Sequence, residues 1–89
     1  MDYLSITNAD ISNVHKIIAN NVKKIRKEKE VNQLELALTI GHKSMSTIGK
    51  IEAGLENKHY NIEQLYKISK ALNVSIKDFF EGVDTVENY

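Results

Sequence analysis

The feature that most constrains this chain is the stretch of residues 32–54, NQLELALTIGHKSMSTIGKIEAG, which predicts two short helices separated by a sharp turn. Asn32 followed three residues later by Glu35 is a capping box, a local signal that starts a helix at residue 33. The apolar positions of this helix share one face at helical spacing: Leu36, Ala37 and Ile40. Gly41 tolerates the positive φ that ends a helix, so the chain is expected to turn there.

A second helix is expected to follow this turn. Ser44 can accept the free backbone amides at its start, and Gly54 is suited to close it. Ile48 and Ile51 give the helix an inward face. Met45 either extends that face as a half-buried side chain or lies at the surface. Three further positions then face outward: Ser46, Gly49 and Lys50.

The residues before this stretch predict one long helix. From about Asp10, apolar residues step along the chain by three and four, which is typical of a helix with one buried face: Ile11, Val14, Ile18, Val22 and Ile25. Three lysines fall on its outer face: Lys23, Lys24 and Lys27. That face is either simply solvated or directed at phosphate groups.

The residues after the stretch predict two more helices. Asn61 and Gln64 form another capping box, followed by the buried face of a fourth helix: Leu65, Ile68 and Leu72. Ser75 and Asp78 restart the chain as a short fifth helix that ends in the adjacent pair Phe79 and Phe80. Adjacent residues cannot both face inward on a helix, so one aromatic is expected to pack on the core. The other is a candidate for contact with a partner, most simply a second copy of the chain.

Composition limits the classes of protein that this chain can represent. Its 89 residues suit one small domain, and 42% hydrophobic with 27% charged residues is ordinary for a soluble globular protein. There is no cysteine, which excludes disulfides and thiolate metal sites, and no apolar run approaches the roughly 20 residues of a membrane span. The first residues, MDYLSITNAD, do not resemble a signal peptide. We therefore expect a cytoplasmic all-α protein without a membrane partner.

The net charge is zero, but the charges are unevenly distributed. Residues 14–60 contain nine basic and five acidic side chains, which gives this segment a charge of +4. Residues 1–13 and 61–89 each carry a charge of −2. Such asymmetry is typical of a small neutral protein with one local surface that faces phosphate groups.

The central stretch resembles the helix-turn-helix of the lambda-repressor/Cro-like, or XRE-type, family at seven positions: Gln33, Ala37, Gly41, Ile48, Ile51, Glu52 and Gly54. Residues 22–31 and 62–80 resemble the first, fourth and fifth helices of the same domain. The resemblance implies a compact five-helix DNA-binding fold. One departure is that Ile48 lies seven residues after Gly41, where the family usually has six. The extra residue, near His42 and Lys43, is expected to affect how the recognition helix enters the DNA groove.

The resemblance also implies which residues contact DNA. The base-facing positions match Met45, Ser46, Gly49 and Lys50. The positions that contact the DNA backbone match Asn32, Gln33, Lys43, Ser44, Thr47, Asn57, Lys58 and Tyr60. Lysine can bond guanine acceptors and methionine can touch a thymine methyl, whereas Gly49 reads no base itself. For residues 55–61 the alternative is an ordinary connecting loop.

In family members, the residues that match Arg26 and Glu52 form a partly buried ion pair between the first helix and the end of the recognition helix. The resemblance therefore implies the same pair here, and the alternative is two unrelated surface charges. Gly41, Ala37 and Ile48 match structural positions of the family. They supply the turn and the contacts between the two helices of the motif.

The sequence does not favour an enzyme. His15, His42 and His59 lie far apart without metal-ligand spacing, so we interpret them as surface residues. The chain has no glycine-rich phosphate loop and no serine elbow. We expect neither a cofactor nor a bound metal.

Together these observations predict a sequence-specific regulator of bacterial or phage type that binds double-stranded DNA. We expect it to repress transcription as a homodimer on a near-palindromic operator. The alternative is a protein-interaction module, for example an antitoxin-like partner of a toxin, with weak or lost DNA binding. Three segments are expected: an arm at 1–9, the DNA-binding domain at 10–80 with its motif at about 32–54, and a short acidic tail at 81–89.

Overall fold

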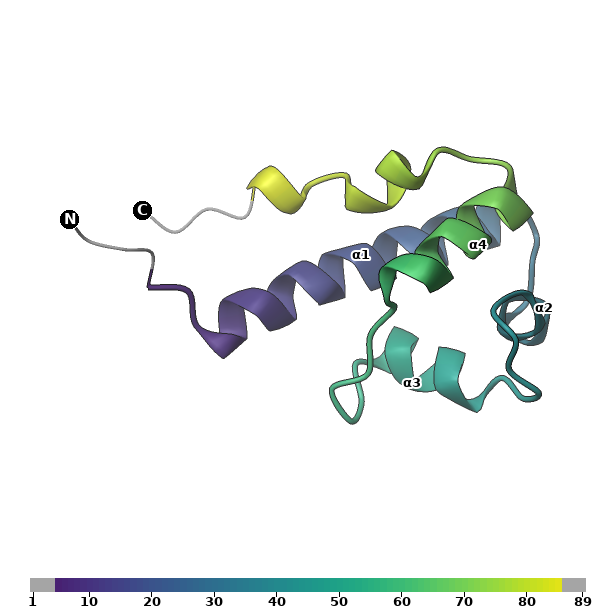
Figure 1. Ribbon diagram of the computed structural model, residues 1–89, viewed down its shortest axis with the longest axis horizontal. Helices are drawn as coiled ribbons and strands as arrows, with labels where there is room; N and C mark the ends of the chain where they lie inside the picture. The colour runs from purple at the N-terminus through teal and green to yellow at the C-terminus, as the bar shows by residue number, and fades with distance from the viewer. Residues whose placement is uncertain (1–4, 86–89) are drawn as a thin grey trace.

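The computed structural model describes residues 5–85, and all regular secondary structure in this part of the chain is helical (Figure 1). The elements are α1 (Asn8–Glu28), α2 (Gln33–Thr39), α3 (Ser46–Ala53), α4 (Ile62–Leu72), and two short 3-10 helices, η1 (Ile76–Phe80) and η2 (Val83–Thr85). The all-α five-helix prediction is confirmed in outline, with the fifth element a 3-10 helix rather than an α-helix. No helix within residues 5–85 is long and apolar enough to cross a membrane.

Capping boxes start three of the four α-helices. The boxes predicted at Asn32 and Asn61 are both present, with side-chain to amide distances of 2.8 Å. A third box joins Thr7 and Asp10, where the Thr7 amide donates to the Asp10 carboxylate at 2.8 Å. Because of it, α1 begins at Asn8, earlier than the periodic apolar residues suggest.

The turn between α2 and α3 is closed by backbone hydrogen bonds. Gly41 has a φ of 84°, and the His42 amide donates to the Ala37 carbonyl at 2.9 Å. The N-cap of α3 is Met45 rather than the expected Ser44, and it makes no side-chain capping bond. The Ser44 hydroxyl instead accepts a long, 3.4 Å hydrogen bond from the Ser46 amide. Helix α3 therefore begins one position later than the sequence suggests, at Ser46.

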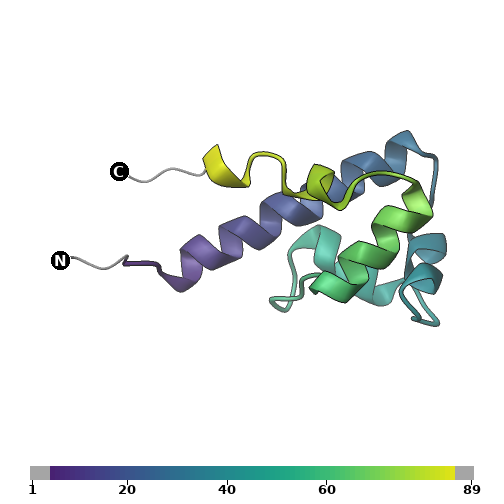
Figure 2. The same ribbon diagram turned by 45° about the horizontal axis from the view of Figure 1, so that its top comes forward.

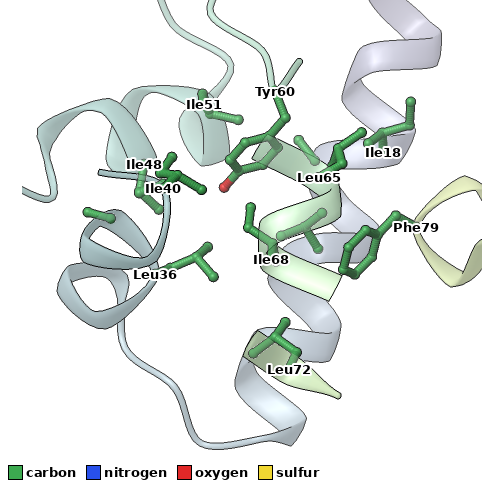
Figure 3. Close-up of a cluster of buried hydrophobic side chains, with 13 residues drawn as sticks. Ile18, Leu36, Ile40, Ile48, Ile51, Tyr60, Leu65, Ile68, Leu72 and Phe79 are labelled. Carbon is green, nitrogen blue, oxygen red and sulfur yellow. The ribbon is translucent and has the colours of Figure 1, made fainter. Parts of the chain in front are cut away.

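One hydrophobic core joins all four α-helices and η1 (Figure 3). Its largest fully buried apolar side chains are Val22, Leu36, Ile48, Leu65, Ile68 and Phe79. Phe79 is therefore the aromatic that packs inward and is not available to a partner. Phe80 is half-buried against the same core.

Tyr60 is also part of this core, although it lies next to the polar loop that follows α3. Its side chain is 4% exposed and lies between α3 and α4 (Figure 3). The expectation that the Tyr60 side chain contacts the DNA backbone is therefore wrong. Its hydroxyl has no hydrogen-bond partner within residues 5–85. Burial raises the pKa of Tyr60 well above its usual range, and the Glu52 carboxylate raises it further.

Replacing Tyr60 with phenylalanine is expected to leave the free energy of unfolding unchanged or to raise it by up to about 1 kcal/mol. The substitution removes a buried hydroxyl that has no hydrogen-bond partner among the described residues, and it retains the apolar ring. Urea denaturation followed by circular dichroism measures the change. Tyr66→Phe is the matched control, because Tyr66 is 54% exposed on α4. A loss of more than 1 kcal/mol in Tyr60→Phe alone would mean that the hydroxyl contributes to the fold.

The segment after α4 runs back along α1 (Figures 1 and 2). Asn21 holds it there, since its side-chain amide donates to the carbonyl oxygens of Phe79 at 2.9 Å and Glu81 at 2.8 Å. Val83 packs against the core beside Phe80. The packed body thus continues past residue 80, into the first part of the expected acidic tail. Residues 1–4 and 86–89, in the expected arm and tail, lie outside the described residues.

Candidate nucleic-acid interface

Helix α3 lies at the lower edge of the molecule in Figure 1, with α2 at one end and the loop to α4 at the other. Ile48 and Ile51 bury its inner side in the core. Met45 at its start is 53% exposed, so the half-buried alternative is wrong, and Ser46 is also exposed. The outer side of α3 is therefore free to approach another molecule.

A buried ion pair fixes the far end of α3. The Arg26 guanidinium donates two hydrogen bonds to the Glu52 carboxylate, each 2.9 Å long, and a third to the Val31 carbonyl at 2.8 Å. The Arg26 and Glu52 side chains are only 8% and 4% exposed. The ion pair implied by the family resemblance is thus present, and it ties α1 to both α3 and the turn before α2.

Gln33 joins the same network from the first turn of α2. Its side-chain nitrogen donates to Glu52 at 2.9 Å, which braces α3 against α2. The side-chain oxygen of Gln33 lies 4.0 Å from the position that a Cβ on residue 49 would take. A methyl group at residue 49 would therefore just touch Gln33 without a clash.

Lys50 is half-buried and does not project freely. Its ammonium group forms an ion pair with Glu56 in the following loop, at 3.1 Å, and the Lys50 and Glu56 side chains are 40% and 55% exposed. Surface pairs of this kind contribute little to stability, so a phosphate or base can compete for Lys50. Sequence reasoning missed Glu56, because nothing in the spacing shows that the loop turns back onto α3.

The residues expected at the DNA backbone come from the start of α2, from the turn and first residues of α3, and from the loop after α3. Asn32, Lys43, Ser44, Asn57 and Lys58 are exposed, and Thr47 is half-buried. The Asn32 side chain already accepts the Glu35 amide as the cap of α2. Lys43 precedes α3 and Lys58 follows it, so basic side chains flank the exposed side of the helix.

Two of the three histidines, which we interpreted as separate surface residues, lie together. The rings of His15 on α1 and His59 in the loop stack with centroids 3.7 Å apart and an interplanar angle of 24°. Burial lowers the pKa of His15, and the charge of His59 lowers it further. Both line a pocket of about 250 Å³ between α1 and the end of α3. No sequence signal indicates this contact, which depends on the path of the loop.

Within residues 5–85, no group of three or more histidine, cysteine or acidic side chains is placed to hold a metal ion.

Two short helices joined by a tight turn, with the second braced from behind and exposed in front, define a helix-turn-helix protein. A helix-turn-helix family model matches residues 22–79, and the chain belongs to this lambda-repressor-like, XRE-type family of DNA-binding transcription regulators. A search of curated proteins finds no match. The match begins within α1 and ends within η1, so the first part of α1 and all of η2 lie outside it.

Proposed function

We propose that this protein is a sequence-specific repressor that binds a near-palindromic operator as a homodimer. The observation that carries the proposal is the placement of α3, whose outer side is exposed while the Arg26–Glu52–Gln33 network fixes its inner side. A major groove about 12 Å wide admits one such helix. We infer that Met45, Ser46 and Lys50 face the base edges, with Gly49 allowing close approach.

The contacts to phosphate are proposed from five exposed residues, Asn32, Lys43, Ser44, Asn57 and Lys58, and from the half-buried Gln33 and Thr47. Direct readout by this set is modest, because only Lys50 carries a charged donor to the bases. Specificity then depends on DNA shape and on the spacing of two half-sites about 34 Å apart. A two-fold homodimer supplies that spacing. The half-buried Phe80 is the remaining aromatic candidate for its interface.

The second candidate function is a protein-interaction module that retains the fold but binds a partner such as a toxin. Two observations favour this second function: the net charge is zero, and Lys50 already forms an ion pair with Glu56.

A measurement of DNA binding distinguishes the two functions. Selection from a randomised duplex pool, followed by sedimentation on the selected site, is expected to give a two-fold motif bound by two copies. If no sequence is enriched, or if one copy binds the best site, the repressor proposal fails.

The contribution of Lys50 is tested with paired substitutions on the selected duplex. Lys50→Ala is expected to relax specificity at one base position by about 1–3 kcal/mol. Glu56→Gln is expected to tighten binding, because it releases Lys50 and removes a negative charge beside α3. The matched controls are Lys67→Ala and Glu63→Gln, which break an ion pair on α4 whose side chains are 48% and 78% exposed. Titration at several salt concentrations should give a slope of about −0.9 per phosphate contacted. If Lys67→Ala and Glu63→Gln changed the affinity for the duplex as much as Lys50→Ala and Glu56→Gln, the result would contradict a role for Lys50.

A further inference from the structure

The loop between α3 and α4 is held against α1 by the stacked rings of His15 and His59. His15 is half-buried on α1, and His59 is exposed in the loop. The loop also carries Asn57 and Lys58, immediately before His59. The histidine contact therefore helps to position these two residues beside α3, together with the backbone hydrogen bond from the Lys58 amide to the Leu55 carbonyl and the burial of Tyr60.

The loop backbone contains local conformational strain. Glu56 and Asn57 are consecutive residues with φ values of 56° and 54°, a left-handed conformation that is unfavourable for glutamate and better tolerated by asparagine. The ion pair between Lys50 and Glu56 links the loop to α3 but not to α1. Loss of the ring contact would thus weaken the attachment of the strained loop to α1.

The charged groups around the two rings do not favour a positive charge on either imidazole. Lys16 from α1 and Lys58 from the loop line the same pocket and are cationic. Glu52 from α3 is the one acidic residue among those lining the pocket, and it is already bonded to Arg26 and Gln33. The other polar side chains lining the pocket are neutral: Ser12, Asn20 and Asn57. Among the described residues that line the pocket, no carboxylate is thus unpaired and able to offset a proton on either ring.

We propose that the His15–His59 stack is a proton-sensitive clasp whose protonation releases the loop from α1. Two imidazolium rings 3.7 Å apart would repel each other, whereas two neutral rings stack favourably. The docked loop binds fewer protons than the released loop, because burial and the charge of His59 lower the pKa of His15 below its ordinary value of 6.5. Docking is therefore strongest above pH 6.5 and weakens as the pH falls below it.

The consequence for DNA rests on the proposed function. Release of the loop would displace Asn57 and Lys58, so phosphate contacts at that end of α3 would be lost at acidic pH. Lower pH would then weaken binding through the loop, even though protonation of histidine usually strengthens attraction to DNA. The clasp is thus a link between the proton concentration and the DNA-binding surface.

The clasp itself is tested without DNA, by an NMR titration of the full chain between pH 5 and 8 in the presence of a chelator. His15 is expected to titrate below its ordinary pKa of 6.5, because burial and the charge of His59 both lower its pKa. The amide signals of residues 55–60 should shift together with the His15 ring. Loop amides that do not respond while the His15 ring titrates, or a His15 midpoint at or above pH 6.5, would overturn the proposal.

His59→Phe separates charge from packing, because phenylalanine can stack on His15 but cannot be protonated. A protonated His15 would then face an aromatic ring, which is an attractive arrangement. The pH-dependent shift of the loop amides is therefore expected to disappear in this variant. His42→Phe is the control and should behave as the wild type. Persistence of the loop response in His59→Phe would contradict the clasp.

The DNA measurement compares wild type and His59→Phe on the same duplex at pH 7.5 and 5.5. The ratio of the wild-type Kd to the variant Kd is expected to rise at least about threefold as the pH falls. A constant ratio, with the NMR response intact, would overturn the link to DNA and leave the clasp as a loop contact alone. If neither protein binds DNA, the proposed function fails, while the NMR result still decides the clasp.

Discussion

Replacing Glu52 with glutamine is expected to lower the free energy of unfolding by about 3 kcal/mol or more. Arg26 would then be left as a buried charge, since its side chain is only 8% exposed and Glu52 accepts two of its three hydrogen bonds. Gln33 would also lose the charged acceptor that braces α2 against α3. Urea denaturation of wild type and variant measures the loss.

Two controls distinguish this effect from the general cost of removing a charge. Glu63→Gln breaks an exposed ion pair with Lys67 on α4, and it should cost about 0.5 kcal/mol or less. The double substitution of Arg26 by methionine and Glu52 by leucine should recover much of the loss, because no unpaired charge remains. A loss below 1 kcal/mol in Glu52→Gln would show that water reaches Arg26 and that the network is not the brace of α3.

Replacing Ser46 with glutamate is expected to reduce affinity for the selected duplex by a factor of about 100 or more. The side chain is exposed on the first turn of α3, where the proposed function places a base edge or phosphate, and like charges there cost several kcal/mol. A carboxylate at a helix N-terminus favours the helix, so the fold should be retained.

The matched control for this substitution is Ala71→Glu, which adds the same charge at an exposed position on α4. It should change affinity only through the net charge, by much less than Ser46→Glu. Circular dichroism and urea denaturation establish that both variants are folded. Equal affinities for the two variants would mean that the exposed side of α3 does not face DNA, and would favour the protein-interaction alternative.

Local signals in the sequence were enough to predict most of the fold. Asn32 and Asn61 start their helices through side chains only three residues away, so no knowledge of the rest of the molecule is needed. Gly41 and Gly54 end theirs through their own backbone conformation, with φ values of 84° and 72°. The ion pair between Arg26 and Glu52 joins distant residues, and only the resemblance to a family indicated it.

The errors concern residues whose surroundings depend on the path of the chain. Tyr60 follows a polar loop, but it lies only two residues before the start of α4, and its ring is buried in the core. The choice between Phe79 and Phe80 depends on how Asn21 places η1 on α1. The stack of His15 on His59 likewise requires the folded loop. Spacing along the chain carries no information on these contacts.

The network around Glu52 also has a consequence for the thermodynamics of DNA binding. Its carboxylate receives hydrogen bonds from α1 and α2, so the angle of α3 is fixed in the free protein. The entropy of ordering α3 is therefore lost during folding and not at the moment of association. For the recognition helix, binding then resembles the docking of a rigid body, and the adaptable part of the surface is confined to the loop.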